Sequence, residues 1–581
     1  MNISNKSDLL QALILCRKAF FAAAGFSMVI NVLQLVPTIY MLQLYDRVVP
    51  TGNMSTLLML TLIVLVLFIT MGLLEWVRSQ VLVRVSSRLE TLLNERLFQV
   101  AYKQSLYSGG LRGGGQPLDD LTALRQFLTG QGLFAFFDAP WIPIYIAVMF
   151  IFHVYFGWAA VATAIVLIAI AVLNEKATAQ KLQEANKLAI IGRNLVNKNL
   201  RNAEVIESMG MLRNVQQRWV AGTRQILILQ ATASERAGLI NALSKLIRMS
   251  SQSLILALGA YLVIENEVTS GMMIAGSTLL SRALAPIDIM IGSWKGFINA
   301  RDQYNRLNEI LLKTPPEKEK MSLPSPQGAF SFEAAVVAPP GSNVAVIKGL
   351  SMVIEKGDVL GVLGPSGAGK STFARALLGI WPTASGKIRL DGAEVFAWNR
   401  HELGPYIGYL PQDIELFEGS ISENIARFGD VDPEKVVIAA QMADVHDLIL
   451  RLPNGYDTFI GADGGTLSGG QRQRIGLARA LYGDPVVVVL DEPNSNLDEQ
   501  GEQALGNAIQ RLKQKNATIV VITHRSNVLS NVSKLLILSE GQLAMYGPRD
   551  QVLAQLQQNI NKQSAPAQAI AASGQPPARP N

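Results

Sequence analysis

Two uncharged runs near the start of the chain are long enough to cross a membrane. Neither residues 19–45 nor residues 48–74 contain a charged side chain, and about 20 apolar residues span the hydrocarbon core of a bilayer. Asp46 and Arg47 separate the two runs, beside the turn-forming residues 50–53. The pattern therefore predicts two membrane spans joined by a tight hairpin.

A third uncharged run covers residues 139–174 and is interrupted only by His153. It is too long for a single span. Gly157 lies near its middle, and a glycine there is a turn signal. We therefore expect a second hairpin, with its turn at Gly157.

Two shorter uncharged runs, residues 249–264 and 268–281, could each be a span or a buried helix of a soluble protein. Glu265 and Glu267, followed by residues 269–271, form a turn signal between them, which favours a third hairpin. The total is six spans within a transmembrane domain of residues 19–294. An even number of spans places both termini on the same side.

The loops between these spans predict the orientation. The long loops after spans two and four are rich in Lys and Arg, whereas the opposite turns contain only Arg47. The positive-inside rule places the long loops, both termini and the N-terminal residues 1–18 in the cytoplasm. We expect much of each long loop to be helix that continues from a span, and the first span to be a retained anchor.

Charged residues inside a span are costly and often functional. Arg282 and Asp288 lie in the sixth predicted span. In one interpretation the span ends early, near Pro286, and Arg282 reaches the interface. In the other, Arg282 lines a polar pathway. The sequence leaves both open.

Composition agrees with a membrane half joined to a soluble half. Hydrophobic residues make up 49% of the chain and charged residues 17%, and the single cysteine excludes an intrachain disulfide and a cysteine-based metal site. The net charge of +6 is explained by basic loops beside the spans, so no nucleic-acid partner is expected. Residues 313–320 and 322–327 are rich in proline and charge, as linkers are, so residues 295–328 are predicted to be a linker. A soluble domain is predicted over residues 329–560. Residues 561–581 are predicted to be a disordered tail.

The soluble half contains a phosphate-binding loop. Residues 359–363 have the length and composition of a buried strand and lead into the G-x-x-x-x-G-K-[ST] pattern. Backbone N–H groups of such a loop bind phosphate oxygens, Lys370 adds a positive charge at the β- and γ-phosphates, and the Ser371 hydroxyl binds Mg²⁺. The predicted ATP-binding residues here are Gly364, Pro365, Ser366, Gly367, Ala368, Gly369, Lys370, Ser371 and Thr372.

A second apolar run, residues 486–490, ends in two acidic residues. Asp491 is placed to hold Mg²⁺, directly or through water, and Glu492 to polarise the attacking water. Acids commonly follow buried strands, so the pattern is informative only together with the phosphate loop upstream.

Four further segments resemble the ATP-binding-cassette (ABC) ATPases. Residues 467–471, Leu-Ser-Gly-Gly-Gln, resemble the family's signature sequence, and Gln412 is similar to its Q-loop glutamine. His524 is similar to its switch histidine, and residues 496–498 to its D-loop. The motifs follow the family's order over residues 329–560. The resemblance implies an α-helical six-span ABC exporter membrane domain followed by an α/β P-loop ABC nucleotide-binding domain.

The resemblance also implies roles. Gln412 would sense the γ-phosphate and bind Mg²⁺ with Ser371 and Asp491, and His524 would act with Lys370 and Glu492 in catalysis. Ser468 and Gly470 would bind the γ-phosphate of a nucleotide held by another cassette. Because a helix N-terminus is a half-site for phosphate and this chain has one cassette, a homodimer with two composite ATP–Mg²⁺ sites is expected.

Three segments resemble the ABC component of type I secretion systems that export proteases and lipases: residues 132–145, 207–213 and 491–498. This implies a protein substrate with an uncleaved C-terminal signal, a periplasmic membrane-fusion adaptor and an outer-membrane channel. It also implies the inner membrane of a Gram-negative bacterium, with lipid as its surroundings. Two alternatives remain open: a lipid or drug exporter of the same architecture, and an ATPase that transports nothing.

Two positions depart from the family pattern. Residues 336–341, where members often carry an aromatic residue that stacks on adenine, contain none. Ala462, with Asp463 next to it, stands where exporters often have glutamate. The second departure puts the coupling between cassette and membrane loops at that residue in doubt.

The missing aromatic residue generates a prediction about the nucleotide. Base stacking contributes about 1–3 kcal/mol in nucleic-acid binders, so we expect weak discrimination of ATP from GTP. Steady-state hydrolysis measured with each nucleotide should give comparable rates. A strong preference for ATP would contradict this expectation.

Overall fold

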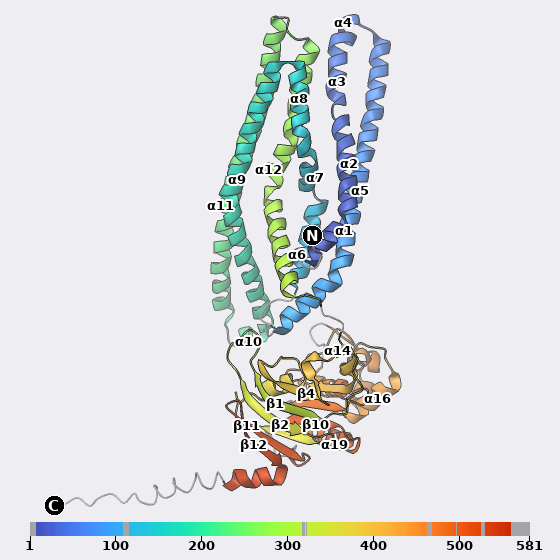
Figure 1. The fold of residues 1–581 in the computed structure, drawn as a ribbon, viewed down its shortest axis with the longest axis vertical. Coiled ribbons are helices and arrows are strands. Elements are labelled where there is room, and N and C mark those ends of the chain that lie inside the picture. The colour runs from blue at the N-terminus through green and yellow to red at the C-terminus, as the bar shows by residue number, and fades with distance from the viewer. Residues whose placement is uncertain are drawn as a thin grey trace, which may run out of the picture. The chain divides into compact units, whose positions relative to one another are not determined.

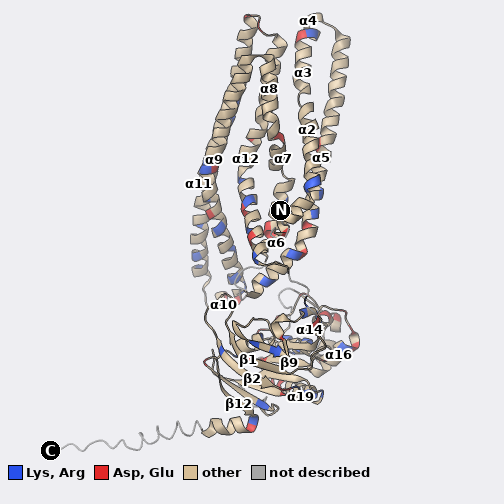
Figure 2. Cartoon of the chain, in the orientation of Figure 1, with Lys and Arg blue, Asp and Glu red and all other residues tan. Residues whose placement is uncertain are grey.

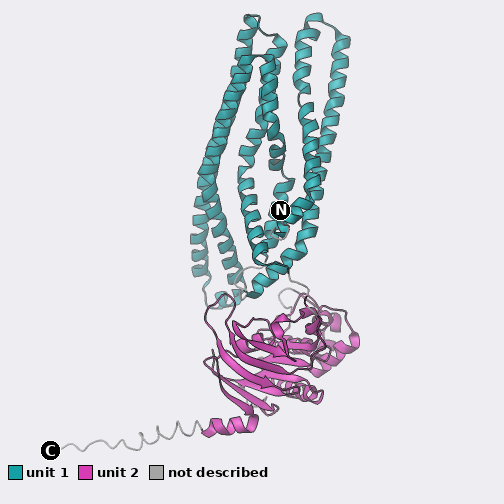
Figure 3. Ribbon diagram, viewed as in Figure 1, with its two compact units in different colours: residues 1–316 teal, residues 317–581 magenta. Residues whose placement is uncertain are grey.

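The computed structural model describes residues 7–107, 115–316, 320, 322–461, 467–495, 497–523 and 529–558. The chain divides into two compact units, Met1–Pro316 and Glu317–Asn581 (Figure 3). Some predictions concern residues outside this described part: residues 1–6, the tail 561–581, Ala462, Asp463, Asn496 and His524.

The first unit is built of long helices (Figure 1). Their bounds are α1 (Asp8–Leu15), α2 (Arg17–Leu33), α3 (Val36–Gln43), the π-helical turn η2 (Leu44–Val48), α4 (Val49–Thr51), α5 (Met54–Tyr107), α6 (Gln116–Thr129), α7 (Gln131–Asp138), η3 (Ala139–Trp141), α8 (Ile142–Phe152), α9 (Val154–Leu200), α10 (Ala203–Ser208), α11 (Leu212–Ile264) and α12 (Ser270–Lys313). Six helical stretches in the described part are long and apolar enough to cross a membrane. The predicted six-span domain is therefore confirmed, and so is the continuation of spans into long helices.

The turn of the second hairpin is not where we expected it. α8 ends at Phe152, and the extended residue His153 joins it to α9. His153 also caps α9, because its Nδ1 accepts a hydrogen bond from the Tyr155 N–H at 3.2 Å. Gly157 lies within α9, so its prediction as the turn is wrong. A Cβ atom on Gly157 would lie 2.2 Å from the Phe150 ring. The glycine therefore permits close packing of the two helices.

The sixth helix does not end at its proline. α12 continues through Pro286 to Lys313, while the point at which the membrane span ends stays a prediction. Proline removes one backbone hydrogen bond inside a helix, which packing against neighbours can offset. Pro286 is buried, and Ala283, Leu284 and Ile287 around it belong to the apolar core of this unit. Whether Arg282, which is half-buried, lines a polar pathway stays a prediction.

Polar contacts join the three outer turns. The Thr269 hydroxyl donates to Asp46 Oδ2 at 2.6 Å, and the Gly271 N–H donates to Asp46 Oδ1 at 2.8 Å. His153 Nε2 lies 3.0 Å from Glu267 Oε2. The residues that the sequence marked only as turn formers therefore hold the hairpins together.

One arginine of the expected basic loop is buried instead. Figure 2 shows Lys and Arg gathered on the lower parts of these helices, with the upper parts mostly uncharged. Arg78 Nη1 contacts Asp138 Oδ1 at 3.3 Å and donates to Ser27 Oγ at 2.9 Å. Asn31 Nδ2 donates to the same Asp138 oxygen at 2.7 Å, and the Tyr145 hydroxyl donates to Asn31. A buried charge needs such partners, so this network ties α2, α5, α7 and α8 in one arrangement.

The second unit contains strands and shorter helices. The strands are β1 (Phe330–Val337), β2 (Ile347–Ile354), β3 (Val359–Leu363), β4 (Ser385–Leu390), β5 (Ala393–Glu394), β6 (Ile407–Leu410), β7 (Gly419–Ser420), β8 (Phe459–Ile460), β9 (Val487–Asp491), β10 (Thr518–Ile522), β11 (Lys534–Ser539) and β12 (Gln542–Pro548). The main helices are α13 (Lys370–Leu377), α15 (Ile421–Ile425), α16 (Pro433–Met442), α17 (His446–Leu450), α18 (Gly469–Leu481) and α19 (Glu499–Gln514).

A six-stranded sheet in the order β12-β11-β3-β10-β9-β6 is the centre of this unit. All its pairs are parallel except β11 with β12. β9 and β10 are buried along their whole length, as expected for strands covered on both faces. A separate antiparallel sheet has the order β2-β1-β4-β5. Because parallel strands end on the same edge, residues that follow β3, β6, β9 and β10 are brought together.

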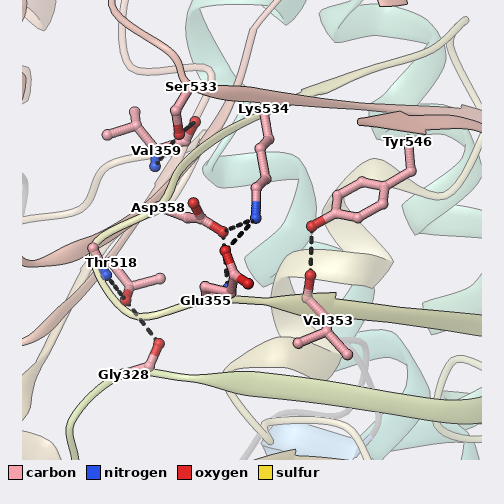
Figure 4. Close-up of polar contacts among 10 residues, drawn as sticks. Gly328, Val353, Glu355, Asp358, Val359, Thr518, Ser533, Lys534 and Tyr546 are labelled. Carbon is pink, nitrogen blue, oxygen red and sulfur yellow. Dashed lines mark hydrogen bonds and ion pairs between the residues drawn. The ribbon is translucent and has the colours of Figure 1, made fainter. Parts of the chain in front are cut away.

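Polar contacts fasten the two sheets to each other (Figure 4). Lys534 Nζ at the start of β11 lies 2.8 Å from both Glu355 Oε2 and Asp358 Oδ2. Burial lowers the pKa of Lys534, but hydrogen bonds to the two carboxylates outweigh it and raise the pKa above its usual value. The Thr518 hydroxyl of β10 donates to the Gly328 carbonyl at 2.7 Å, ahead of β1. The ammonium group therefore stays charged and anchors the β2–β3 turn.

The close contact at Gly157 generates a prediction. Gly157→Ala should lower the thermal unfolding midpoint of the detergent-solubilised protein, because the new methyl group overlaps Phe150 and overpacking costs about 1–3 kcal/mol. Gly238→Ala is the matched control, since Gly238 in α11 has open space around its Cβ position. Adding Phe150→Leu to Gly157→Ala should restore part of the loss. An unchanged midpoint in Gly157→Ala would show that the helices can separate without cost.

Candidate nucleotide-hydrolysis site

The phosphate-binding loop follows β3 and leads into α13, as the sequence predicted. Gly367 and Gly369 have φ angles of 80° and 97°, which side chains with a Cβ atom rarely adopt. A Cβ atom on Gly364 would lie 2.4 Å from the Leu538 carbonyl oxygen. The loop therefore needs glycine at three positions, and its exposed apex, residues 365–367, is open to a ligand.

Lys370 is buried at the first position of α13. Its Nζ donates to the carbonyl oxygens of Gly364 at 2.8 Å and Pro365 at 3.1 Å. Burial lowers the pKa of Lys370, while Glu492 and Asp491 raise it. Carbonyl oxygens thus hold the ammonium group under the loop. A bound phosphate can replace these oxygens as its hydrogen-bond partner.

Asp491 ends β9 and is almost fully buried. Burial raises the pKa of its carboxyl group, and a hydrogen bond from Ser371 lowers it. Asp491 Oδ1 is buried without a hydrogen-bond partner among the described residues. Mg²⁺ prefers oxygen ligands and keeps several waters. An orphaned carboxylate oxygen beside a hydroxyl therefore fits this ion.

Glu492 takes an unusual backbone conformation. Its φ of 51° is left-handed, and its N–H donates to the Ile522 carbonyl at the end of β10, at 2.9 Å. Gln412, two residues after β6, donates from Nε2 to Glu492 Oε2 at 3.0 Å. The hydrogen bonds fix the carboxylate at the edge where the parallel strands end. The contacts of Gln412 with nucleotide and Mg²⁺ stay predictions.

The signature segment forms the N-terminus of α18. Ser468 accepts from the Gln471 N–H at 3.3 Å, while its own N–H donates to Gln471 Oε1 at 2.9 Å, a capping box. Ser468 and Gly470 line a polar hollow of about 670 Å³ together with Arg474 and Asp498. Arg474 pairs with Asp498 at 2.5 Å. The hollow's lining in the described residues includes no member of the phosphate loop.

The structure also shows residues that motif reasoning missed. Arg375, on α13, lowers the pKa of Asp491 by its charge and lies 4.8 Å over the Trp381 ring. Gln473, fully buried in α18, donates to the Pro493 carbonyl next to the two acids. Gln473 lies two residues after the signature segment, and this proximity was its one available signal, whereas nothing in the sequence marks Arg375.

Comparison with known proteins adds to this geometry. Residues 347–495 match the ABC transporter family model, and residues 20–286 match the model of the ABC transporter transmembrane region. The chain is 41% identical over 562 residues to the type I secretion system ATP-binding protein PrsD of Rhizobium meliloti (strain 1021), covering 96% of this chain and 97% of PrsD. The chain belongs to the type I secretion branch of the ABC transporters.

Two more distant likenesses agree with this assignment. The leukotoxin translocation ATP-binding protein LktB of Mannheimia haemolytica is 26% identical over 93% of this chain and 77% of its own length. The structure of a bacterial Atm1-family ABC exporter with ATP bound superposes with a TM-score of 0.80 at 23% identity, over 97% of this chain and 99% of that one. The last comparison shows the exporter fold.

As an ABC transporter, the protein binds nucleotide and hydrolyses ATP in a cycle coupled to transport. It crosses the membrane several times. Within that family setting, the hydrogen bond between Gln412 and Glu492 joins the end of β6 to the predicted catalytic carboxylate. The roles predicted for Glu492, Lys370 and the signature residues stay predictions.

The position of Glu492 generates a prediction. Glu492→Gln should keep ATP binding but lower the hydrolysis rate by about 10²–10⁴-fold, the usual contribution of a general base. It should also trap closed dimers in the presence of ATP. Phosphate release and size-exclusion chromatography measure the two effects.

Glu434→Gln removes the same charge from the exposed surface of α16 and is the matched control. It should leave both readouts unchanged. Full hydrolysis in Glu492→Gln would exclude Glu492 as the group that polarises the water.

Proposed function

We propose that this protein is the inner-membrane ATPase of a type I secretion system, which exports a protein substrate carrying an uncleaved C-terminal signal. The 41% identity to PrsD over nearly the whole of both chains carries the proposal. The name of the more distant LktB, a leukotoxin translocation protein, supports a protein as the cargo. A lipid or drug exporter of the same architecture is not favoured by these relatives.

The proposed assembly is a homodimer. The signature hollow opens beside the N-terminus of α18, a half-site for phosphate, yet its described lining lacks the phosphate loop. A second chain can bring its loop there, so that two ATP molecules each contact both cassettes. Ser468, now capping its own helix, and Gly470 would then bind the γ-phosphate.

Mg²⁺ is the proposed ion of each site. Ser371, Gln412 and Asp491 would hold it with water, and it would neutralise charge on the phosphates. Lys370 and the loop N–H groups would orient the phosphates, while Glu492 and His524 would position the attacking water. When nucleotide binds, Gln412 would leave Glu492 and move towards the ion. This movement would transmit nucleotide binding to the rest of the cassette.

The basic loops support an orientation with both termini and the ATPase unit in the cytoplasm. We also propose two regions that couple ATP hydrolysis to the spans, residues 117–127 and residues 205–219. The second has exposed apolar side chains, including Val205, Met209 and Trp219. Residues 117–127 are more internal, since Asp120 is buried and paired with Arg306 at 2.7 Å. Both regions stay candidates for transmitting the motion of the hydrolysis cycle to the spans. A periplasmic adaptor and an outer-membrane channel would complete the export path.

The test uses the full-length protein in lipid discs. C-terminal fragments of candidate secreted proteins should bind and change the ATP hydrolysis rate, whereas scrambled fragments of equal composition should not. Glu492→Gln controls for hydrolysis by contaminants. A response only to lipids or drugs would contradict protein export and would also remove the reason to expect an adaptor and channel.

A further inference from the structure

A hollow of about 730 Å³ lies where α1, α2 and α5 meet in the first unit. Four cationic side chains line it: Arg17 and Lys18 at the start of α2, and Arg84 and Arg88 on α5. The rest of the lining is apolar apart from Cys16, and it contains no carboxylate. Neither the hydrolysis site nor the proposed export path makes use of this hollow.

The four cations have no ion-pair partner among the residues that the structure describes. All four side chains are exposed. Two of the acids on these helices are paired with other arginines, Asp8 with Arg96 at 2.9 Å and Glu90 with Arg125 at 2.6 Å. Arg84 and Arg88 are four residues apart on one helix face, where like charges repel. An anion in the hollow would relieve that repulsion.

The position of the hollow points to the kind of anion. Arg17 and Lys18 come directly before the uncharged residues 19–45, at the polar end of the first span. The exposed Leu15 and Ala22 lie beside the cations in the lining. The site thus offers positive charge next to apolar surface, at the level where a bilayer has its headgroups.

We propose that this hollow binds the phosphate headgroup of an anionic phospholipid from the leaflet on the side of the basic loops. Basic pockets between membrane helices recognise such headgroups. The phosphate contacts Arg17, Lys18, Arg84 and Arg88, and the first part of the acyl chains lies along Ala22 and Val81. The bound lipid connects α2 to α5 at the base of the first hairpin.

The test titrates full-length protein in neutral detergent with short-chain phosphatidylglycerol, with phosphatidylcholine of the same chains, or with inorganic phosphate. The readout is the thermal unfolding midpoint. Phosphatidylglycerol should raise it at low concentration, and the other two should not. In Arg84→Gln/Arg88→Gln and in Arg17→Gln/Lys18→Gln, the half-saturating phosphatidylglycerol concentration should rise about tenfold or more, because each cation near a headgroup strengthens binding.

The matched control is Arg224→Gln/Lys245→Gln, which removes two exposed cations of α11 that are outside the hollow. Its half-saturating concentration should change by about twofold at most. If one hollow variant fails to fold without lipid, the other still tests the site.

Three results would overturn the proposal. Equal losses in control and hollow variants would show unspecific attraction of lipid to a basic surface. Stabilisation by inorganic phosphate but not by phosphatidylglycerol would make the hollow a site for a free anion. A change of oligomeric state in the hollow variants without any lipid would make it a surface between two copies of the chain. None of these results bears on ATP hydrolysis or protein export.

Discussion

The parallel pairing of three buried strands is the constraint on which the rest of the ATPase unit depends. Ile522 is paired with both Val362 and Asp491 across β3, β10 and β9, so the phosphate loop and the two acids must leave the sheet at one edge. Between their end residues the strands carry no polar side chain, as expected for strands that are covered on both faces. Polar groups can appear only where the strands end, and there they meet.

Charges are buried in both units, and in each case a small set of partners makes this tolerable. Arg78 and Asp138 share their environment with Ser27 and Asn31, and removal of either charged residue would leave the other charge uncompensated. Asp491 is different because one of its oxygens has no partner. In the membrane unit the charges hold helices together, whereas in the ATPase unit the unpartnered oxygen of Asp491 fits the proposed Mg²⁺.

The sequence predicted the elements whose signals are local. Uncharged runs mark the spans, and the phosphate loop and the strand ending in Asp491 are continuous segments. Gly157 was misread, and Pro286 left two interpretations open, because the same residue types serve two purposes: glycine marks a turn or a close approach, and proline ends a helix or is held in one by its neighbours. The burial of Arg78, and the contact of Gln412 with Glu492, depend on residues far apart in the chain, for which no single segment carries a signal.

Pro286 has a mechanical consequence. With 44 residues and a rise of 1.5 Å per residue, α12 is about 66 Å long. Proline supplies no N–H to the carbonyl four residues earlier, so the turn between Arg282 and Pro286 lacks one of the hydrogen bonds that stiffen the remainder. A long rod bends where its resistance is lowest. The sixth helix therefore consists of two rigid segments joined by a more flexible turn at Pro286. A force on either end of the helix bends it at that turn.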